Sequence, residues 1–163
     1  MKATHDPAAP LRVQIVEFDR CRESLYDIRY RVFVVEQGVP ESIEHDETDP
    51  FCRHVLAHWE GKPVGTGRLT PEGRIGRMAV LPEFRRHSVG SAMLEALLGE
   101  AREQGFPEVM LAAQLSAVTF YERFGFEAQG AVFTEAGIDH LMMRRRFDSP
   151  DPRSADTPDS THP

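Results

Sequence analysis

The sequence has few of the residues that build disulfide frameworks or zinc sites. Its only cysteines are Cys21 and Cys52, which lie far apart and lack the close spacing of a zinc-binding motif. We therefore expect two free thiols, a reducing compartment and no metal site. The first ten residues lack the apolar segment of a signal peptide, and no apolar run approaches the roughly 20 residues of a membrane span. These absences predict a cytoplasmic protein without a membrane partner.

The sequence also lacks an excess of positive charge. Arginine and lysine total 19 against 26 acidic residues, so the formal net charge is −7. This charge argues against a nucleic-acid partner held by a positive field, and it suits a cationic or amine substrate. Hydrophobic residues make up 40% of the 163-residue chain, which is enough for the core of one soluble domain. We expect that domain over residues 11–147, between disordered Pro-containing tails at 1–10 and 148–163.

Hydrophobic periodicity predicts both strands and helices. Alternating apolar residues favour a strand at 11–18, and Asp19 then suits the N-cap of a helix that runs to about residue 36. The buried face of this helix would carry four apolar residues at helical spacing, Leu25, Ile28, Val32 and Val35. The remaining elements are three hairpin-connected strands, a helix, a strand, a helix and two strands, at 54–60, 63–70, 74–81, 87–104, 108–114, 116–124, 126–135 and 138–147.

The predicted order of elements, β-α-β-β-β-α-β-α-β-β, indicates an α/β (α+β) fold. Hairpin connections make most of the sheet antiparallel. The helix at 87–104 links two strands that should run parallel, because parallel neighbours need a crossover connection of this kind. We therefore expect a single domain with a mixed, mostly antiparallel sheet flanked by helices.

The segment LPEFRRHSVGSAM, residues 81–93, places two arginines beside small residues at an expected helix start. The unpaired N–H groups and the dipole at a helix start favour an anion. Gly90 and Ser91 would let a bulky ligand approach the backbone, and Arg85 and Arg86 would add charge-assisted bonds to phosphate. The alternative is a solvated helix start with incidental arginines. A nucleotide site of the ATP type is disfavoured, since the sequence contains neither a Walker motif nor G-x-G-x-x-G.

A second segment, QLSAVTFYERFGF at 114–126, follows a predicted strand. Together with MAVLPEFRRHSVGSAM it resembles the two acetyl-CoA motifs of the GNAT superfamily of N-acetyltransferases, over about residues 12–147. The flanking RYRVFVVEQGVPE is similar to a small bacterial subgroup of that superfamily. Ser88 stands where the first motif usually has glycine, and Gln114 stands where the second usually has asparagine. Ser88 keeps a backbone N–H and Gln114 keeps an amide, so both departures retain the groups that the reaction requires.

The resemblance implies a splayed parallel strand pair, with acetyl-CoA as co-substrate in the notch between the strands and an amine as acceptor. Backbone groups of Met78, Ala79 and Val80 would pair with the pantetheine arm, and an N–H near Ala79 or Val80 would hold the oxyanion. The amides from Arg86 to Ser91 would wrap the pyrophosphate. The residues implied in coenzyme binding are Met78, Ala79, Val80, Arg85, Arg86, His87, Ser88, Val89, Gly90, Ser91, Gln114, Ala117 and Tyr121.

Two proton transfers need side chains. The resemblance gives Tyr121 the role of general acid for the leaving thiolate, with packing between helix and sheet as the alternative role of its ring. The amine must also lose a proton, yet the strand before Tyr121 carries no carboxylate within 109–111, where some family members have one. The candidate bases are therefore Glu36, Glu44, Asp46, Glu135 and His140. His140 is slightly favoured because histidine titrates near neutrality, and a solvated surface role is the alternative for each.

The leading hypothesis is an acetyl-CoA-dependent N-acetyltransferase that modifies a primary amine of a small molecule or peptide by direct attack. A non-catalytic acyl-CoA-binding or regulatory domain is the alternative, and Ser88 leaves it open. The sequence does not identify the acceptor, and a homodimer is one option for the assembly. His54 and His58 are expected on a sheet face rather than at a metal. The arginines at 144–146 are expected to form a surface charge run.

Overall fold

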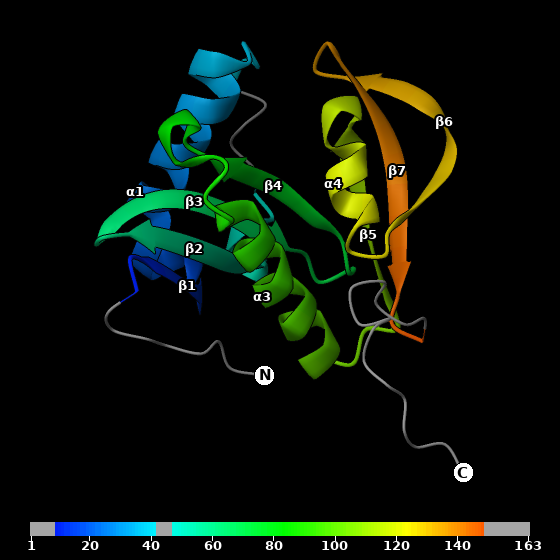
Figure 1. Cartoon of the computed structure of the whole chain (residues 1–163), viewed down its shortest axis with the longest axis horizontal. Coiled ribbons are helices and arrows are strands. Elements are labelled where there is room, and N and C mark those ends of the chain that lie inside the picture. The colour runs from blue at the N-terminus through cyan, green and yellow to red at the C-terminus, as the bar shows by residue number, and fades with distance from the viewer. Residues whose placement is uncertain (1–8, 42–46, 149–163) are drawn as a thin grey trace. The chain divides into compact units, whose positions relative to one another are not determined.

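The computed structural model describes residues 9–41 and 47–148 (Figure 1). The chain divides into two compact units, one ending at Gly105 and one beginning at Phe106. Two of the candidate bases, Glu44 and Asp46, lie outside the described residues, as does most of each expected tail.

A four-stranded antiparallel sheet forms the centre of the first unit, in the spatial order β1-β2-β3-β4. Its strands span Leu11–Val16 (β1), Arg53–Trp59 (β2), Lys62–Leu69 (β3) and Ile75–Val80 (β4). Strands β2, β3 and β4 follow one another as hairpins, and β1 pairs with β2. The four strands and the hairpin order predicted from alternating hydrophobicity are confirmed.

Two long helices cover opposite faces of this sheet (Figure 1). They are α1 (Phe18–Arg29) and α3 (Val89–Glu103), and both contact β3. Gly65 of β3 faces α3, where a Cβ atom would lie only 2.8 Å from Met93 Sδ. On the other face, Arg68 of β3 and Arg29 of α1 meet at Asp49. Strand β3 is therefore buried on both sides, and its glycine lets α3 pack close to the sheet.

The start of α1 differs from the prediction. Its N-cap residue is Glu17 rather than Asp19, and the Glu17 side chain makes no capping hydrogen bond. Asp19 lies inside the first turn and pairs with Arg22 at 3.0 Å. The earlier start brings Phe18, which is only 5% exposed, into contact with the His54 ring. Burial of this aromatic ring outweighs the roughly 1 kcal/mol that a side-chain cap supplies.

The helix expected to run to about residue 36 changes form along its length. After α1 ends at Arg29, a π-helix follows over Tyr30–Glu36, with Gln37 N donating to Val32 O at 3.1 Å. Val32 is 2% exposed, whereas Val35 is 67% exposed. The predicted burial of Val35 is wrong because it assumed α-helical spacing, and the wider π turn moves this residue off the core face.

A three-stranded antiparallel sheet in the order β5-β7-β6 forms the second unit, together with one short helix. These elements span Glu108–Gln114 (β5), Val118–Glu122 (α4), Glu127–Glu135 (β6) and Ile138–Arg146 (β7). The helix is shorter than the predicted 116–124, because Leu115–Ala117 forms a 3-10 turn before it. The predicted strands are confirmed, and the central β7 pairs with both neighbours.

The three arginines at the end of β7 do not form a uniform surface run. Arg145 is only 2% exposed, whereas Arg146 is exposed. Successive side chains of a strand point to opposite faces, so the middle arginine points into the unit when its neighbour points out. The expectation of a surface charge run is therefore wrong for Arg145.

The mixed α/β fold is confirmed, with antiparallel pairing in both sheets. Strand β4 is the terminal strand of the first sheet, and β5 is the terminal strand of the second. The splayed parallel pair would involve these two strands, one from each unit, and it stays a prediction.

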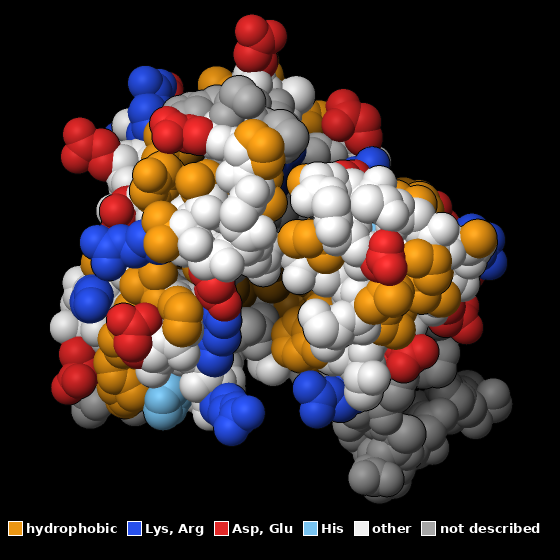
Figure 2. Space-filling view, turned by 90° about the horizontal axis from the view of Figure 1, so that it is seen from above, with side chains coloured by type: hydrophobic (Ala, Val, Ile, Leu, Met, Phe, Trp, Pro, Cys, Tyr) orange, Lys and Arg blue, Asp and Glu red, His pale blue; other side chains and the backbone are white. Residues whose placement is uncertain are grey.

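The exposed surface carries charges of both signs. Figure 2 shows acidic and basic side chains interspersed with hydrophobic ones over the face in view. None of the helices within residues 9–41 and 47–148 combines the length and the hydrophobicity needed to cross a membrane.

Candidate functional site

Strand β4 carries a bulge beside the backbone groups predicted to pair with pantetheine. Gly76 pairs with Arg68 and Ala79 pairs with Thr66, so two residues of β4 lie opposite one residue of β3. Arg77, the first of these two, has a positive φ of 52°. Bulges redirect a strand and are common next to functional sites. Because β4 is the terminal strand of its sheet, the backbone of Met78–Val80 has a side that no strand of this sheet pairs.

The chain turns sharply between β4 and α3. Arg86 has a φ of 69°, and Ser88 lies in the left-handed region with φ 64° and ψ 17°. A non-glycine residue adopts this conformation at a cost of about 1–2 kcal/mol. The departure from glycine at Ser88 therefore falls on a position whose backbone favours glycine.

The first turn of α3 has backbone amides that form no hydrogen bond within the helix. The first α-helical bond runs from Ala92 N to Ser88 O at 3.1 Å, and the Ser88 side chain does not cap the helix. The N–H groups of Val89, Gly90 and Ser91 precede this bond, so they have no acceptor within the helix. Residues 85–88 are all exposed, and the small Gly90 and Ser91 are half-buried. This arrangement suits a diphosphate bound by main-chain amides.

The side chain of Arg85 is engaged elsewhere. Its two terminal nitrogens donate to the two carboxylate oxygens of Glu36 at 2.7 Å each, and its Nε donates to Val80 O at 3.0 Å. Hydrogen bonding to Arg85 lowers the pKa of the Glu36 carboxyl, and the same contact raises the pKa of Arg85. The structure thus joins a predicted phosphate-binding residue to a predicted general base, and this pairing weakens Glu36 as a base.

Aromatic side chains support the same loop. The His87 ring contacts Trp59 of β2 in a tilted arrangement with 5.1 Å between ring centroids, and the Phe84 ring contacts the same indole at 6.2 Å. Lys62 Nζ lies 5.4 Å from the centre of the Phe84 ring. These contacts tie the turn after β4 to the β2–β3 hairpin, and they give His87 a packing role beside its predicted place in the coenzyme loop.

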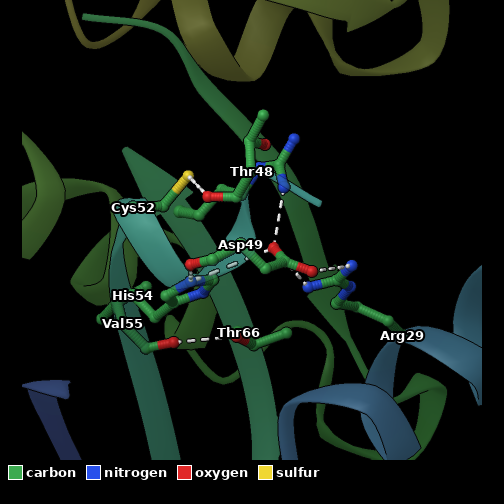
Figure 3. Close-up of polar contacts among 8 residues, drawn as sticks. Arg29, Thr48, Asp49, Cys52, His54, Val55 and Thr66 are labelled. Carbon is green, nitrogen blue, oxygen red and sulfur yellow. Dashed lines mark hydrogen bonds and ion pairs between the residues drawn. The ribbon is translucent and has the colours of Figure 1, made fainter. Parts of the chain in front are cut away.

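A buried carboxylate, which the sequence analysis missed, lies at the end of the acidic loop (Figure 3). Asp49 is fully buried, and Arg29 donates to both of its carboxylate oxygens at 3.1 and 3.0 Å. Arg68 donates to the first of these oxygens at 2.7 Å, and His54 Nε2 lies 2.8 Å from the Asp49 backbone oxygen. Burial would raise the pKa of Asp49, but bonds and charge from Arg29, then from Arg68, hold it below its ordinary value.

The sequence did contain a signal for this cluster. Arg29 follows Leu25 by four residues and precedes Val32 by three, so it lies on the apolar stripe of its helix. A charged residue on such a stripe is buried only with a partner, which the acidic loop supplies. His54 is 1% exposed, and burial lowers its pKa despite the nearby Asp49. Within residues 9–41 and 47–148, no group of three or more potential metal ligands gathers.

In the second unit, Tyr121 lies in an aromatic cluster. It is 9% exposed, and its ring makes edge contacts with Phe120 and Phe126 at centroid distances of 5.1 and 5.8 Å. Burial raises the pKa of the Tyr121 phenol to about 12. The ring therefore packs within this cluster, its hydroxyl group stays protonated at neutral pH, and its role as general acid stays a prediction.

The other predicted residues of this unit lie on its three strands, except Ala117, which lies in the 3-10 turn before α4. Gln114 ends β5 and pairs with His140 of β7 in the register. His140 is 8% exposed, its Nδ1 lies 2.7 Å from Ile138 O, and its ring stacks on Phe133. Because a carbonyl oxygen only accepts, Nδ1 donates this bond, and Nε2 is the ring nitrogen that takes no part in it. Glu135 is exposed at the end of β6.

Comparison with known proteins agrees with these features. The acetyltransferase (GNAT) domain family matches residues 16–147. A candidate acetyltransferase of Bacillus subtilis is 34% identical over 145 residues, covering 85% of this chain and 99% of its own. The crystal structure of an acyl-CoA N-acyltransferase from Pseudomonas aeruginosa is 30% identical with a TM-score of 0.74, covering 83% of this chain and 99% of that one. Escherichia coli ElaA is 28% identical with a TM-score of 0.73 and the same coverage. The chain belongs to the GNAT family of acetyltransferases.

Proposed function

We propose that the chain is an acetyl-CoA-dependent N-acetyltransferase that acts on a primary amine of a small molecule or a peptide. Membership of the GNAT family supports acyl transfer, and the Pseudomonas aeruginosa relative is described as using acyl-CoA. The observation that carries the proposal is the exposed turn at 85–88, which leads into the uncapped first turn of α3. An extended arm along a sheet edge, followed by a diphosphate at a helix start, matches the shape of the coenzyme.

Main-chain groups do most of the coenzyme binding in this proposal. Met78, Ala79 and Val80 pair with the amides of the pantetheine arm, and one of their N–H groups polarises the thioester carbonyl. The amides from Arg86 to Ser91 hold the pyrophosphate, with Gln114 and Ala117 completing the coenzyme contacts. The Arg85 side chain supports this loop through Glu36 rather than through the phosphate.

Tyr121 supplies the hydrogen bond to the leaving sulfur. Its pKa of about 12 exceeds the roughly 8.5 of a thiol, so full transfer of the phenol proton to a free thiolate is uphill. The phenol therefore donates a hydrogen bond to the developing thiolate while the carbon–sulfur bond breaks. Its raised pKa keeps this donor protonated at every working pH.

The amine nitrogen attacks the thioester carbon directly, so no covalent enzyme intermediate is needed. A carbon–nitrogen bond forms, the carbon–sulfur bond breaks and the amine loses one proton to a base, while CoA leaves as a thiolate that is hydrogen-bonded to Tyr121 and takes up a proton from water on release. We place His140 first among the bases, because the bond from Nδ1 to Ile138 O orients the ring and leaves Nε2 as the nitrogen that could accept a proton. Glu36 is paired with Arg85, and Glu135 lies exposed at a strand end; both remain weaker candidates. We also propose a cytoplasmic location, and a homodimer is one option for the oligomeric state.

The alternative is an acyl-CoA-binding domain without turnover. The strained backbone at Ser88 is the observation that favours it, since a distorted loop would bind the coenzyme in a less productive position. A panel of small amines and amine-bearing peptides, assayed for release of free CoA thiol, separates the two functions. We expect release above the hydrolytic background with at least one amine class. Tight acetyl-CoA binding by calorimetry without release on any amine would support the alternative.

A further inference from the structure

The helix that carries Tyr121 ends in a tightly bonded cap. Tyr121 O accepts from Phe124 N at 2.9 Å and from Phe126 N at 3.3 Å, and Gly125 N donates to Glu122 O at 3.0 Å. Gly125 has a φ of +88°. This is the Schellman arrangement, in which a left-handed glycine folds the chain back over the helix end. The contact between the Tyr121 and Phe126 rings is the apolar contact that accompanies such caps.

Arg145 completes this cap from the central strand of the second unit. Its Nη1 donates to Phe124 O at 2.8 Å, in the turn that ends the helix. The guanidinium also fills the space beside Gly125, since a Cβ atom there would collide with Arg145 Nη1 and lie 3.1 Å from its Cδ and Cζ. The side chain is 2% exposed, so these atoms have little freedom to move aside. Gly125 is required here by its φ and by the arginine packed against it.

The position of Arg145 in the sheet makes this contact rigid. Arg145 pairs with Val109 of β5 in the register, and β7 is the central strand of its sheet. A cation at the C-terminal end of a helix also interacts favourably with the helix dipole. The end of α4, and with it the backbone of Tyr121, is therefore held by a charged side chain whose own backbone is fixed by pairing with β5.

We infer that Arg145 is a positioning residue: it fixes the capped end of α4 and thereby holds the Tyr121 phenol in the orientation that serves the leaving sulfur. This role rests on the proposed function, because it matters for turnover only if Tyr121 donates to the thiolate. Arg145 itself touches neither substrate nor coenzyme in this role.

A double-mutant cycle with Tyr121→Phe tests the inference. We expect Arg145→Met to lower kcat on the order of a hundredfold, as misplacement of a reacting group by about 1 Å does, with an unchanged KM for acetyl-CoA. In the Tyr121→Phe background the same change should cost almost nothing more, because the hydroxyl that Arg145 positions is already absent. Losses that multiply in the double mutant would overturn the inference and leave Arg145 a general structural role.

Two further variants keep the test decisive. Arg145→Lys retains the buried charge but not the fork of donors, so it should fold and lose about tenfold in kcat with the same dependence on Tyr121. Arg146→Met, at the exposed neighbouring position, is the matched control and should leave kcat unchanged. If Arg145→Lys has wild-type kcat and Arg145→Met does not fold, the positioning role is overturned.

Amide hydrogen exchange on the full chain separates this inference from the proposed function. Arg145→Lys should lower the protection of the Phe126 and Gly125 amides at least about tenfold, while Arg146→Met leaves it unchanged. Unchanged protection would overturn the inference even if the chain proves to be an active acetyltransferase. Reduced protection in a chain that acetylates no amine would instead mean that the proposed function fails while Arg145 still holds the helix end.

Discussion

Arg85 and Glu36 face each other through two parallel hydrogen bonds of 2.7 Å across 49 residues of sequence. The sequence motifs give these residues separate roles, one in phosphate binding and one in amine deprotonation. Their pairing changes both expectations, because a carboxylate held by a guanidinium has a lowered pKa and a guanidinium held by a carboxylate is less available to phosphate. The third bond, from Arg85 Nε to Val80 O, links the pair to the end of β4.

Because the Glu36–Arg85 pair is proposed to support the coenzyme loop, Glu36→Gln should lower the affinity for acetyl-CoA. We expect the KM for acetyl-CoA to rise by up to about fivefold with kcat nearly unchanged, because an exposed ion pair supplies at most about 1 kcal/mol. Steady-state kinetics with the best amine of the panel provides the measurement. Glu83→Gln, at another exposed carboxylate near Arg85, is the control and should change neither constant. A large fall in kcat at constant KM would instead identify Glu36 as the base.

Ser88→Gly should stabilise the protein. Ser88 has φ 64° and ψ 17°, a conformation that glycine adopts without the roughly 1–2 kcal/mol that a residue with a side chain pays. Glycine also increases the entropy of the unfolded state, which destabilises the fold by a somewhat smaller amount. We expect a net gain of about 0.5–1 kcal/mol in the free energy of unfolding, with acetyl-CoA affinity equal or higher. Denaturant unfolding and calorimetry measure the two effects.

The matched control for this substitution is Ser91→Gly. Ser91 has an ordinary position within α3, where glycine destabilises by about 0.5–1 kcal/mol, so the sign of the stability change should reverse. A loss of stability at both positions would show that the left-handed conformation of Ser88 is not strained.

Tyr121→Phe should remove the hydrogen bond to the leaving sulfur and keep the aromatic packing. We expect kcat to fall by about 10²–10³-fold, the cost of removing one hydrogen-bond donor to a developing negative charge, with little change in acetyl-CoA binding. Phe120→Leu is a packing control that alters an edge contact of the same ring but leaves the hydroxyl in place. Wild-type turnover in Tyr121→Phe would remove the phenol from the mechanism.

The pH profile offers an independent check on Tyr121. A group whose pKa is raised to about 12 loses its proton only in strong alkali, so the kcat profile should show no decline caused by Tyr121 below about pH 11. An alkaline decline near pH 9 that disappears in Tyr121→Phe would contradict the raised pKa.

Asp49→Asn should destabilise the first unit and change how stability depends on pH. Removing one partner of a buried ionic cluster costs about 3–5 kcal/mol, since Arg29 and Arg68 remain buried. The pKa of Asp49 is lowered by folding, so its contribution is present above the unfolded value of about 3.9 and is lost as pH falls through the folded pKa. The wild-type protein should therefore lose stability below about pH 4 more steeply than the variant.

Unfolding curves at several pH values provide this measurement. Asp27→Asn serves as the control, because Asp27 is exposed and pairs only with Arg31 one helical turn away in the described ion pairs. Loss of the Asp27–Arg31 ion pair should lower the free energy of unfolding by no more than about 0.5 kcal/mol. Equal effects of the two substitutions would mean that the buried cluster does not stabilise the fold.

Local patterns predicted much of the fold and part of the site. The strands of both units and the long helix α3 follow from alternation and helical spacing, which depend on residues close together in the chain. The turn into α3 was readable for the same reason, since Gly90, Ser91 and the preceding arginines are neighbours. The errors lie where spacing alone is ambiguous, as at the π-helix that leaves Val35 exposed.

The sequence by itself determined the element order, the GNAT motifs and the position of Tyr121, because each of these is a property of a short contiguous segment. Only the tertiary structure decided which charges are buried and which partners they have. Arg29, Arg68 and Asp49 come together from three distant segments, and Arg145 reaches a helix cap 21 residues before it. A charged side chain is buried only where long-range packing brings it a partner, and the linear order of residues does not contain that geometry.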